Sequence, residues 1–285
     1  MPTLTNRLDL PNFYVKAVEY WSKHHDSQAD YSVTELLDTP RRVQLMRQHR
    51  DEMTEDVADR TWSLLGSAAH KVIESANEED NGDTLVSEYR MFADVDGVRI
   101  SGQCDIYDKT NNTIYDLKTA SAWEIIHGVK KERELQLNCY AYLGRREGWQ
   151  VDGIAAVFLL RDWSKMEALR NHDYPQQQVV VAPLRLWEDE YAEAFIKERI
   201  SLHEAAKKSL PYCTAEEQWR KLDVWAVHSE GRKSAHRLLD SEEAANTYAE
   251  TVKGGFVVHR PGEAVRCEKY CSVNTFCTQY EAMKK

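Results

Sequence analysis

Gly102-Gln103-Cys104-Asp105 and, after a polar turn at Asn111-Asn112, Asp116-Leu117-Lys118 together predict a β-hairpin that carries two carboxylates and a lysine. Two aspartates on neighbouring strand ends can hold Mg²⁺ or Mn²⁺, because their oxygens suit a hard cation and the ion cancels their mutual repulsion. We expect Asp116 and Lys118 on one sheet face, since side chains on a strand repeat with period two. A cation and an ammonium group facing one cleft can hydrolyse a phosphodiester. An Asp-x-Lys triplet alone is also a common solvated charge pattern.

The segment upstream of the hairpin, Gly66 to Glu74, is expected to be helical. Apolar residues in and before it recur at helical spacing, and His70 falls near the inward face that they form. These apolar residues are Trp62, Leu65, Ala69, Val72 and Ile73. An imidazole at this place is either a core residue with satisfied polar atoms or a ligand for a transition-type cation.

Downstream of the hairpin, a second helix is expected from about Lys131 to Arg146. Gln136 and Tyr140 are four residues apart and therefore share one face of it. Their amide and phenol are candidates to contact a DNA phosphate or to brace Lys118. The alternative is a plain amphipathic helix.

The four pieces occur in the order Gly-x-x-x-His, Gly-x-x-Asp, Asp-x-Lys and Gln-x-x-x-Tyr. This order resembles the PD-(D/E)XK nuclease superfamily, and specifically its RecB-like exonuclease branch. That branch includes the nuclease domains of RecB and AddB and the CRISPR-adaptation nucleases, and this chain is most similar to phage-encoded members. The resemblance spans roughly residues 60–145. It implies an α/β fold in which helices flank a central mixed β-sheet.

The same resemblance assigns roles to individual residues. The implied ligands of Mg²⁺ or Mn²⁺ are His70, Asp105, Asp116 and the Leu117 carbonyl. The implied catalytic residues are Lys118, Asp116, Asp105, Gln136 and Tyr140, with Lys118 as the catalytic lysine. Glu88, on the strand before the hairpin, and Glu74, one turn beyond His70, are acidic neighbours to which we assign no role.

The C-terminal region contains three of the six cysteines within eleven residues, Cys267, Cys271 and Cys277. Such crowding suggests a metal site, since the chain lacks the signal peptide that a disulfide framework would normally accompany. Zinc and iron–sulfur clusters normally require four protein ligands. The expected fourth ligand is Cys213, in a proline-marked loop before a predicted helix start at Thr214, with Glu217 completing a capping box. Cys104 and Cys139 are better interpreted as small buried residues.

The resemblance favours a 4Fe-4S cluster at this site, because several RecB-like nucleases pin such a cluster with one distant cysteine and a tight C-terminal trio. Two departures keep zinc as the alternative, and a metal-free cluster of buried thiols is the third possibility. The trio here is Cys-x₃-Cys-x₅-Cys, and the distant cysteine follows the nuclease core. The role would be structural, because the site ties the C-terminus to the loop near Cys213.

Composition describes a soluble globular protein, with 42% apolar residues and a mean hydropathy of −0.63 over 285 residues. The longest apolar run, Ile154 to Leu160, is too short to span a bilayer, and Met1 to Leu10 has no signal-peptide pattern. We therefore expect a cytoplasmic protein without a membrane partner, in the host cytoplasm if it is phage-encoded.

The net charge of −10 argues against a general nucleic-acid-coating protein. A local basic strip near the cleft is either a DNA contact or a solvated helix face: Lys130, Lys131, Arg133, Arg145 and Arg146.

Patterning along the chain predicts three segments: a helical N-terminal wall of the cleft (residues 1–60), a nuclease core (61–208) and a C-terminal metal-cluster lobe (209–285). Two short helices are expected on either side of Pro40. Strands are expected over 84–118, 154–161 and 178–182, a long amphipathic helix over 184–208, a hairpin around Gly231 and a helix near 242–248.

The function expected from the resemblance is a metal-dependent DNA exonuclease that acts in phage recombination, repair or DNA processing and leaves a 5′ phosphate. Its partners would be DNA ends or single strands, together with a recombination partner protein. The sequence leaves two alternatives open, an end-trimming nuclease that works with an integrase, as in CRISPR adaptation, and a non-cleaving nucleic-acid-binding protein on the same fold. It does not predict the oligomeric state. Because imidazole nitrogen favours a transition metal, Mn²⁺ should support activity at least as well as Mg²⁺.

Overall fold

The computed structural model describes residues 2–21, 28–78 and 83–284, and the chain forms two compact units. The larger unit comprises residues 1–40 and 50–209, and the smaller unit comprises residues 41–49 and 210–285. None of the described helices is long and apolar enough to cross a membrane.

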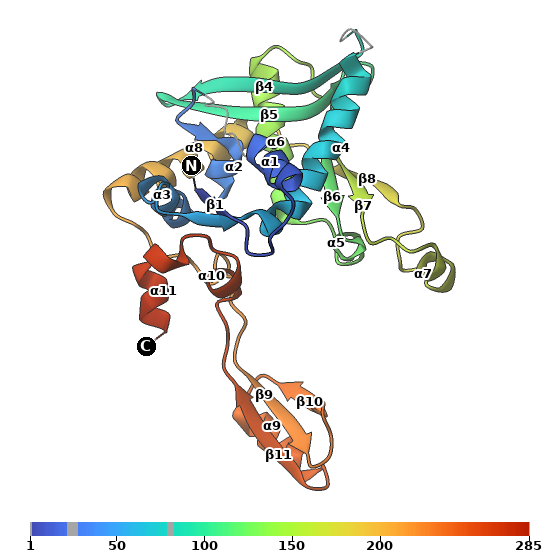
Figure 1. Cartoon of the computed structure of the whole chain (residues 1–285), viewed down its shortest axis with the longest axis vertical. Helices are drawn as coiled ribbons and strands as arrows, with labels where there is room; N and C mark the ends of the chain where they lie inside the picture. The colour runs from blue at the N-terminus through green and yellow to red at the C-terminus, as the bar shows by residue number, and fades with distance from the viewer. Residues whose placement is uncertain (1, 22–27, 79–82, 285) are drawn as a thin grey trace. The chain divides into compact units, whose positions relative to one another are not determined.

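A six-stranded mixed sheet forms the centre of the larger unit, with β4 pairing β5 beside the path β2-β5-β6-β7-β8. Its strands are β2 (Tyr31–Ser32), β4 (Leu85–Val95), β5 (Val98–Asp108), β6 (Thr113–Ala120), β7 (Gly153–Leu160) and β8 (Val179–Leu184). The turn between β4 and β5 has positive φ at Asp96 and Gly97, the conformation of a tight hairpin. β6 and β7 run parallel, while β5–β6 and β7–β8 are antiparallel. The predicted α/β class with a central mixed sheet is therefore confirmed (Figure 1).

Helices lie against this sheet and around it. They are α1 (Asn12–Trp21), α2 (Val33–Leu37), α4 (Thr61–Glu78), α5 (Ala122–Ile126), α6 (Lys131–Arg146), α7 (Lys165–Arg170) and α8 (Asp189–Lys208), with a 3₁₀ helix η1 (Val57–Arg60). A two-stranded parallel sheet pairs β1 (Thr3–Thr5) with β3 (Thr54–Asp56). α6 contacts β4, β5, β6 and β7, and its buried residues Leu137 and Leu143 join the main core with Phe158 of β7.

The smaller unit contains a cysteine-bearing lobe and a separate small sheet. Its elements are α3 (Pro40–Gln48), β9 (Val224–Ser229), β10 (Arg237–Leu239), α9 (Glu242–Glu250), β11 (Gly255–Arg260), α10 (Val265–Lys269), the 3₁₀ helix η2 (Asn274–Phe276) and α11 (Thr278–Met283). The sheet order is β10-β9-β11, with both pairs antiparallel.

The predicted helix break at Pro40 is confirmed, because α2 ends at Leu37 and α3 begins at Pro40, where a missing backbone N–H costs nothing. The capping box of α2 explains its start, since Ser32 and Glu35 bond each other's backbone N–H groups. The long helix begins at Asp189 and not at Leu184, because Leu184 still pairs with Ile154 in the sheet.

Two other expectations were wrong. Thr214 and Glu217 do make the reciprocal bonds of a capping box, but residues 215–219 form a turn and no helix. The apolar stripe of α4 is not buried either, since Trp62, Leu65 and Val72 are 59%, 45% and 70% exposed. The helical period was right, but this face of α4 borders an open apolar cavity of about 550 Å³ against β7 and β8.

Candidate metal centre

The candidate site lies where β5 and β6 separate. These strands pair only between Ile106–Asp108 and Thr113–Tyr115, after which β6 continues alongside β7. On the same edge of β5, β2 pairs with Ile100 and Ser101, so residues 102–105 border a gap in the ladder. Asp105 and Asp116 are the first residues beyond the last pair on each strand. The hairpin therefore brings both carboxylates to one opening in the sheet.

The carboxylates of Asp105 and Asp116 lie close enough for their charges to repel each other. Asp116 is 1% exposed and Asp105 is mostly buried. Asp105 Oδ2 accepts a hydrogen bond from the Leu117 backbone N–H at 2.7 Å. Burial first, and then the charge of Asp116, raise the pKa of Asp105 to about 6. Two such groups so close together are expected where a cation is to be bound.

Lys118 and Asp116 are directly linked, as their alternation on the strand predicted. Lys118 Nζ donates to Asp116 Oδ1 at 2.7 Å. The other oxygen, Asp116 Oδ2, is buried and has no hydrogen-bond partner among the described residues. A buried carboxylate oxygen without a partner is costly unless a bound group satisfies it. This oxygen fits the role of a metal ligand.

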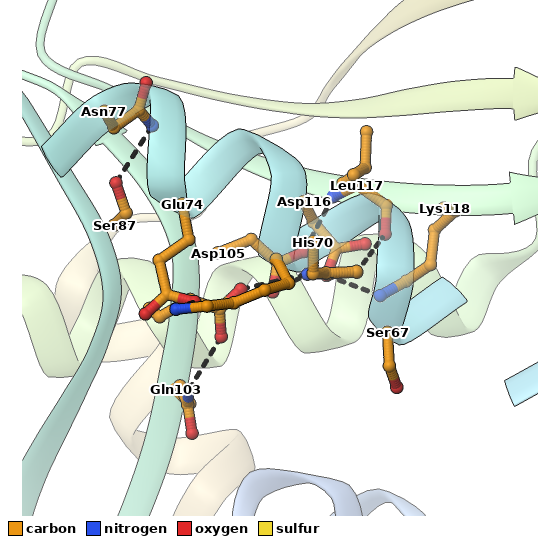
Figure 2. A network of polar contacts seen from close by, with 12 residues as sticks. Ser67, His70, Glu74, Asn77, Ser87, Gln103, Asp105, Asp116, Leu117 and Lys118 are labelled. Atoms are coloured by element: carbon orange, nitrogen blue, oxygen red, sulfur yellow. Dashed lines mark hydrogen bonds and ion pairs between the residues drawn. The ribbon is translucent and has the colours of Figure 1, made fainter. Parts of the chain in front are cut away.

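His70 of α4 lies beside the hairpin. Figure 2 shows its ring and the Asp105 side chain near the 116–118 segment of β6. His70 Nε2 lies 3.2 Å from the Leu117 carbonyl oxygen, and Nδ1 lies 3.7 Å from Asp105 Oδ1. The four residues expected as metal ligands are therefore neighbours, with an imidazole nitrogen, two carboxylates and a carbonyl available. This donor set suits Mn²⁺ or Mg²⁺.

Glu88 of β4 is the site residue that the sequence left without a role. Its Oε1 lies 3.0 Å from His70 Nδ1, and its Oε2 accepts from Gln103 Nε2 at 2.7 Å. His70, Glu88 and Asp105 each offer a ligand atom within 4.8 Å of the others. The hydrogen bond with Glu88 is the main cause of the raised pKa of His70. Glu88 also has a positive φ of 48°, an uncommon backbone conformation for this residue type.

The Gln136–Tyr140 pair lies on α6, as predicted. Gln136 Nε2 donates to the Tyr140 hydroxyl at 2.7 Å. Tyr140 is buried, which raises the pKa of its phenol, and the nearby charges of Asp116 and Asp105 act in the same direction. Its ring also packs so close to Gly102 that a Cβ there would lie 2.8 Å from it. The glycine of the Gly-x-x-Asp motif thus allows α6 to approach β5 beside the two aspartates.

Several charged neighbours have partners elsewhere. Glu74 pairs with Lys71 at 3.0 Å on α4. Most of the basic strip is held by carboxylates, Arg133 by Glu124 and Arg146 by Asp189. The pairs agree with the solvated-face interpretation of the strip.

The cysteines divide into two kinds. Cys104 and Cys139 are buried in the larger unit, and burial raises the pKa of both thiols. The other four lie half-buried in the smaller unit: Cys213, Cys267, Cys271 and Cys277. Burial raises the pKa of Cys213 to about 12, with further contributions from Glu217 and from the thiols of Cys277 and Cys267. Burial and the thiols of Cys271 and Cys277 raise the pKa of Cys267.

Hydrogen bonds hold the segments that carry these four cysteines together. Gln279 of α11 accepts from the Cys213 backbone N–H at 2.8 Å and donates to the Cys213 carbonyl at 2.9 Å. Arg41 of α3 donates to Cys277 Sγ at 3.2 Å and to the carbonyl of Pro211.

Known proteins share features with this chain. The family model described as the PD-(D/E)XK nuclease superfamily matches residues 16–278. A search of curated proteins finds no match. Among solved structures, SSO0001 is similar at 15% identity and a TM-score of 0.45, over 66% of this chain and 84% of that one. A phage-related exonuclease from Haemophilus somnus 129PT is similar at 19% identity and a TM-score of 0.35, over 52% of this chain and 71% of that one.

Proposed function

The chain belongs to the PD-(D/E)XK nuclease superfamily, and from this premise we propose that it is a divalent-metal-dependent DNA exonuclease. The observation that carries the proposal is the buried, unpartnered Asp116 Oδ2 beside Lys118 Nζ. A protein that only binds nucleic acid would need neither the unsatisfied oxygen nor the ammonium group next to it. The alternative of a non-cleaving protein is therefore disfavoured.

The residues that would hold the ion are His70, Asp105, Asp116 and the Leu117 carbonyl. When bound, Mg²⁺ or Mn²⁺ supplies Lewis acidity at the scissile phosphate and lowers the pKa of water. Asp105 and Asp116 contribute the negative charge that attracts the ion into a mostly buried position. Glu88 holds the His70 ring through Nδ1, which leaves Nε2 directed toward the Leu117 carbonyl.

Lys118 would position the attacking water. Its ammonium group is held in place by Asp116 Oδ1, so its direction is set by the strand that also carries the ligand. A fixed cation there costs no reorganisation when charge develops on the phosphate. Gln136 and Tyr140 form a hydrogen-bonded pair on the neighbouring helix and would limit the space around this strand.

The smaller unit would hold a 4Fe-4S cluster on Cys213, Cys267, Cys271 and Cys277. These four cysteines are half-buried, and the thiols of Cys277 and Cys267 lie close enough to Cys213 to raise its pKa. The role of the cluster would be to tie the loop at Cys213 to the C-terminal segment, and zinc is the alternative occupant.

The test is digestion of linear and covalently closed circular DNA with Mg²⁺ or Mn²⁺ present. We expect loss of the linear form alone, no reaction without metal, and no reaction with Asp116→Ala or Lys118→Ala although both variants remain folded by circular dichroism. Glu74→Gln is the matched control, because Glu74 lies one turn from His70 on α4 but pairs with Lys71. Cleavage of the circular form would assign an endonuclease. An unchanged rate for both site variants would refute the assignment of the site.

A further inference from the structure

The small sheet of the smaller unit has one covered and one open face. Residues at alternate positions of a strand point to opposite faces. On the covered face, Val227 of β9 forms a core with Ala245 and Ala249 of α9, and Val257 of β11 packs against it. Arg237 of β10 also lies on this face, with its guanidinium 5.6 Å from the Tyr248 ring of α9.

The open face is formed by the intervening positions, which the strand register places side by side. Phe256 is opposite His228, while Leu238 and Val258 flank Ala226 on either side. Phe256, Leu238 and Val258 are 46%, 53% and 39% exposed, while Ala226 between them is fully buried. The larger apolar side chains of this face are therefore exposed among the described residues. The full set at these positions is Val224, Ala226, His228, Leu238, Phe256, Val258 and Arg260.

Polar groups on this face are arranged around the aromatic ring. The rings of His228 and Phe256 lie 5.9 Å apart with an interplanar angle of 22°. Arg260 donates from Nη2 to His228 Nε2 at 3.1 Å. An aromatic ring, an imidazole and a guanidinium group thus form one continuous row.

Charge is distributed unevenly in this module. The chain carries a net charge of −10, yet residues 224–260 contain five Lys or Arg and five Asp or Glu. No carboxylate occurs at the seven open-face positions. The acidic residues are in the β9–β10 turn, before α9 and within α9: Glu230, Asp240, Glu242, Glu243 and Glu250. The open face therefore combines exposed apolar side chains with one guanidinium group and no carboxylate, in an otherwise acidic protein. This combination suits a polyanion that has apolar surfaces of its own.

We propose that this open face, formed by β9, β10 and β11, binds single-stranded DNA. An unpaired base stacks on an exposed aromatic ring such as Phe256, and a guanidinium group such as Arg260 contacts phosphate. Duplex DNA does not fit the same description, because its bases are already stacked inside the helix. The proposal deepens the proposed function, on which it rests for DNA as the substrate, by naming the unpaired strand as the form that is held.

The test measures binding of a fluorescent oligodeoxythymidine to the full chain by anisotropy, in buffer without added divalent metal so that the strand stays intact. Phe256→Ala should weaken binding about tenfold, the scale of one base–aromatic stack. Arg260→Gln should weaken binding and reduce the slope of log K against log salt by about 0.7, the value for one phosphate contact on a single strand. Duplex DNA should bind more weakly and respond less to Phe256→Ala.

Arg237→Gln is the matched control, since it removes the same charge from the covered face of the same sheet. It should leave the binding of single strands within twofold of the unchanged protein, and thermal melts should show that all three variants are folded. The proposal would be overturned if Phe256→Ala and Arg260→Gln both bound single strands with the affinity and the salt slope of the unchanged protein. Self-association by light scattering that Phe256→Ala abolishes, without an effect on DNA binding, would also overturn it and assign the face to a second copy.

The outcomes separate this inference from the nuclease assignment. If the protein binds single strands through Phe256 but cuts no DNA with any divalent metal, the inference stands and the proposed function fails. If it cuts DNA but Phe256→Ala binds single strands normally, the inference alone fails.

Discussion

His70 Nδ1 lies 3.0 Å from Glu88 Oε1, so a carboxylate from β4 holds the imidazole that α4 contributes to the metal centre. A carboxylate on one ring nitrogen fixes the tautomer and leaves the other nitrogen free to bind a metal. Gln103 holds the second Glu88 oxygen, and Arg90 in turn donates to Gln103 at 2.6 Å. Glu88 adopts a positive φ of 48°, an arrangement that costs free energy and is commonly retained at functional sites.

Glu88→Gln should therefore weaken Mn²⁺ binding by about 10–100-fold, the usual effect of losing a carboxylate that orients a metal-bound histidine. The measurement is isothermal titration calorimetry with Mn²⁺, in the absence of DNA. Glu74→Gln is the control, because Glu74 lies one turn from His70 on α4 but pairs with Lys71. Equal Mn²⁺ affinity in Glu88→Gln and the unchanged protein would show that Glu88 does not orient the ligand.

The affinity for the divalent metal should depend on pH at values near 6. The pKa of Asp105 is raised to about 6, and that of His70 is also raised. A metal needs the ionised carboxylate and the neutral imidazole, so protons compete with it and affinity should fall as pH is lowered through about 6. Titrations at pH 6 in two buffers of different ionisation enthalpy should show proton release on binding, and the release should shrink by pH 7.5. Affinity that stays constant from pH 7.5 to 5.5 would exclude both groups as ligands.

The choice of metal tests the imidazole directly. Nitrogen donors favour Mn²⁺ over Mg²⁺, so cleavage at equal metal concentration should be at least as fast with Mn²⁺. His70→Asp replaces the nitrogen with an oxygen donor and should shift the ratio of rates toward Mg²⁺. Rates with Mg²⁺ that exceed those with Mn²⁺ across a full titration of the unchanged protein would count against His70 as a ligand.

Contacts between residues close in the sequence could be predicted at this site, whereas contacts between residues far apart in the sequence could not. The hairpin follows from local turn chemistry and from alternation, which also placed Asp116 beside Lys118. Glu88 could not be assigned in this way, because its contact with His70 depends on the register of β4 against β5 and on a left-handed backbone that the residue type does not suggest.

Burial was harder to predict than secondary structure. The helical period of α4 was correct, but Val72 is exposed, since a periodic pattern does not say what covers a face. β11 was also missed. Its residues from Phe256 to His259 are apolar enough for a strand, but its end at Arg260 and its pairing with β9 depend on contacts distant in sequence.

The visible spectrum tests the cysteine lobe. Freshly purified protein should show broad visible absorbance that bleaches on reduction, and Cys213→Ser should lose it. Cys139→Ala is the control, because Cys139 is buried on α6 in the larger unit and should not affect the colour. A colourless protein that contains zinc would replace the iron–sulfur assignment by the zinc alternative.

Two motif glycines should respond in opposite directions to the same substitution. A Cβ at Gly102 would lie 2.8 Å from Leu143 Cδ1 and from the Tyr140 ring, closer than the packed core allows. Gly102→Ala should therefore lower the free energy of unfolding by about 1–3 kcal/mol, as overpacking does, and should reduce cleavage because it displaces Tyr140 from beside Asp116. Urea denaturation and a cleavage assay measure the two effects.

Gly66 of α4 meets no such obstacle, since its Cβ would lie 3.5 Å from Thr119 Oγ1, an ordinary contact. Gly66→Ala should raise the free energy of unfolding by about 0.8–1 kcal/mol, because alanine is the better helix former in a helix interior. If this variant is more stable but cleaves DNA more slowly, the glycine serves the approach of the substrate to His70 and not the fold. If it is less stable, helix propensity does not decide the stability at this position. If Gly102→Ala and Gly66→Ala lowered the free energy of unfolding equally, the close packing around Gly102 would not explain its sensitivity to substitution.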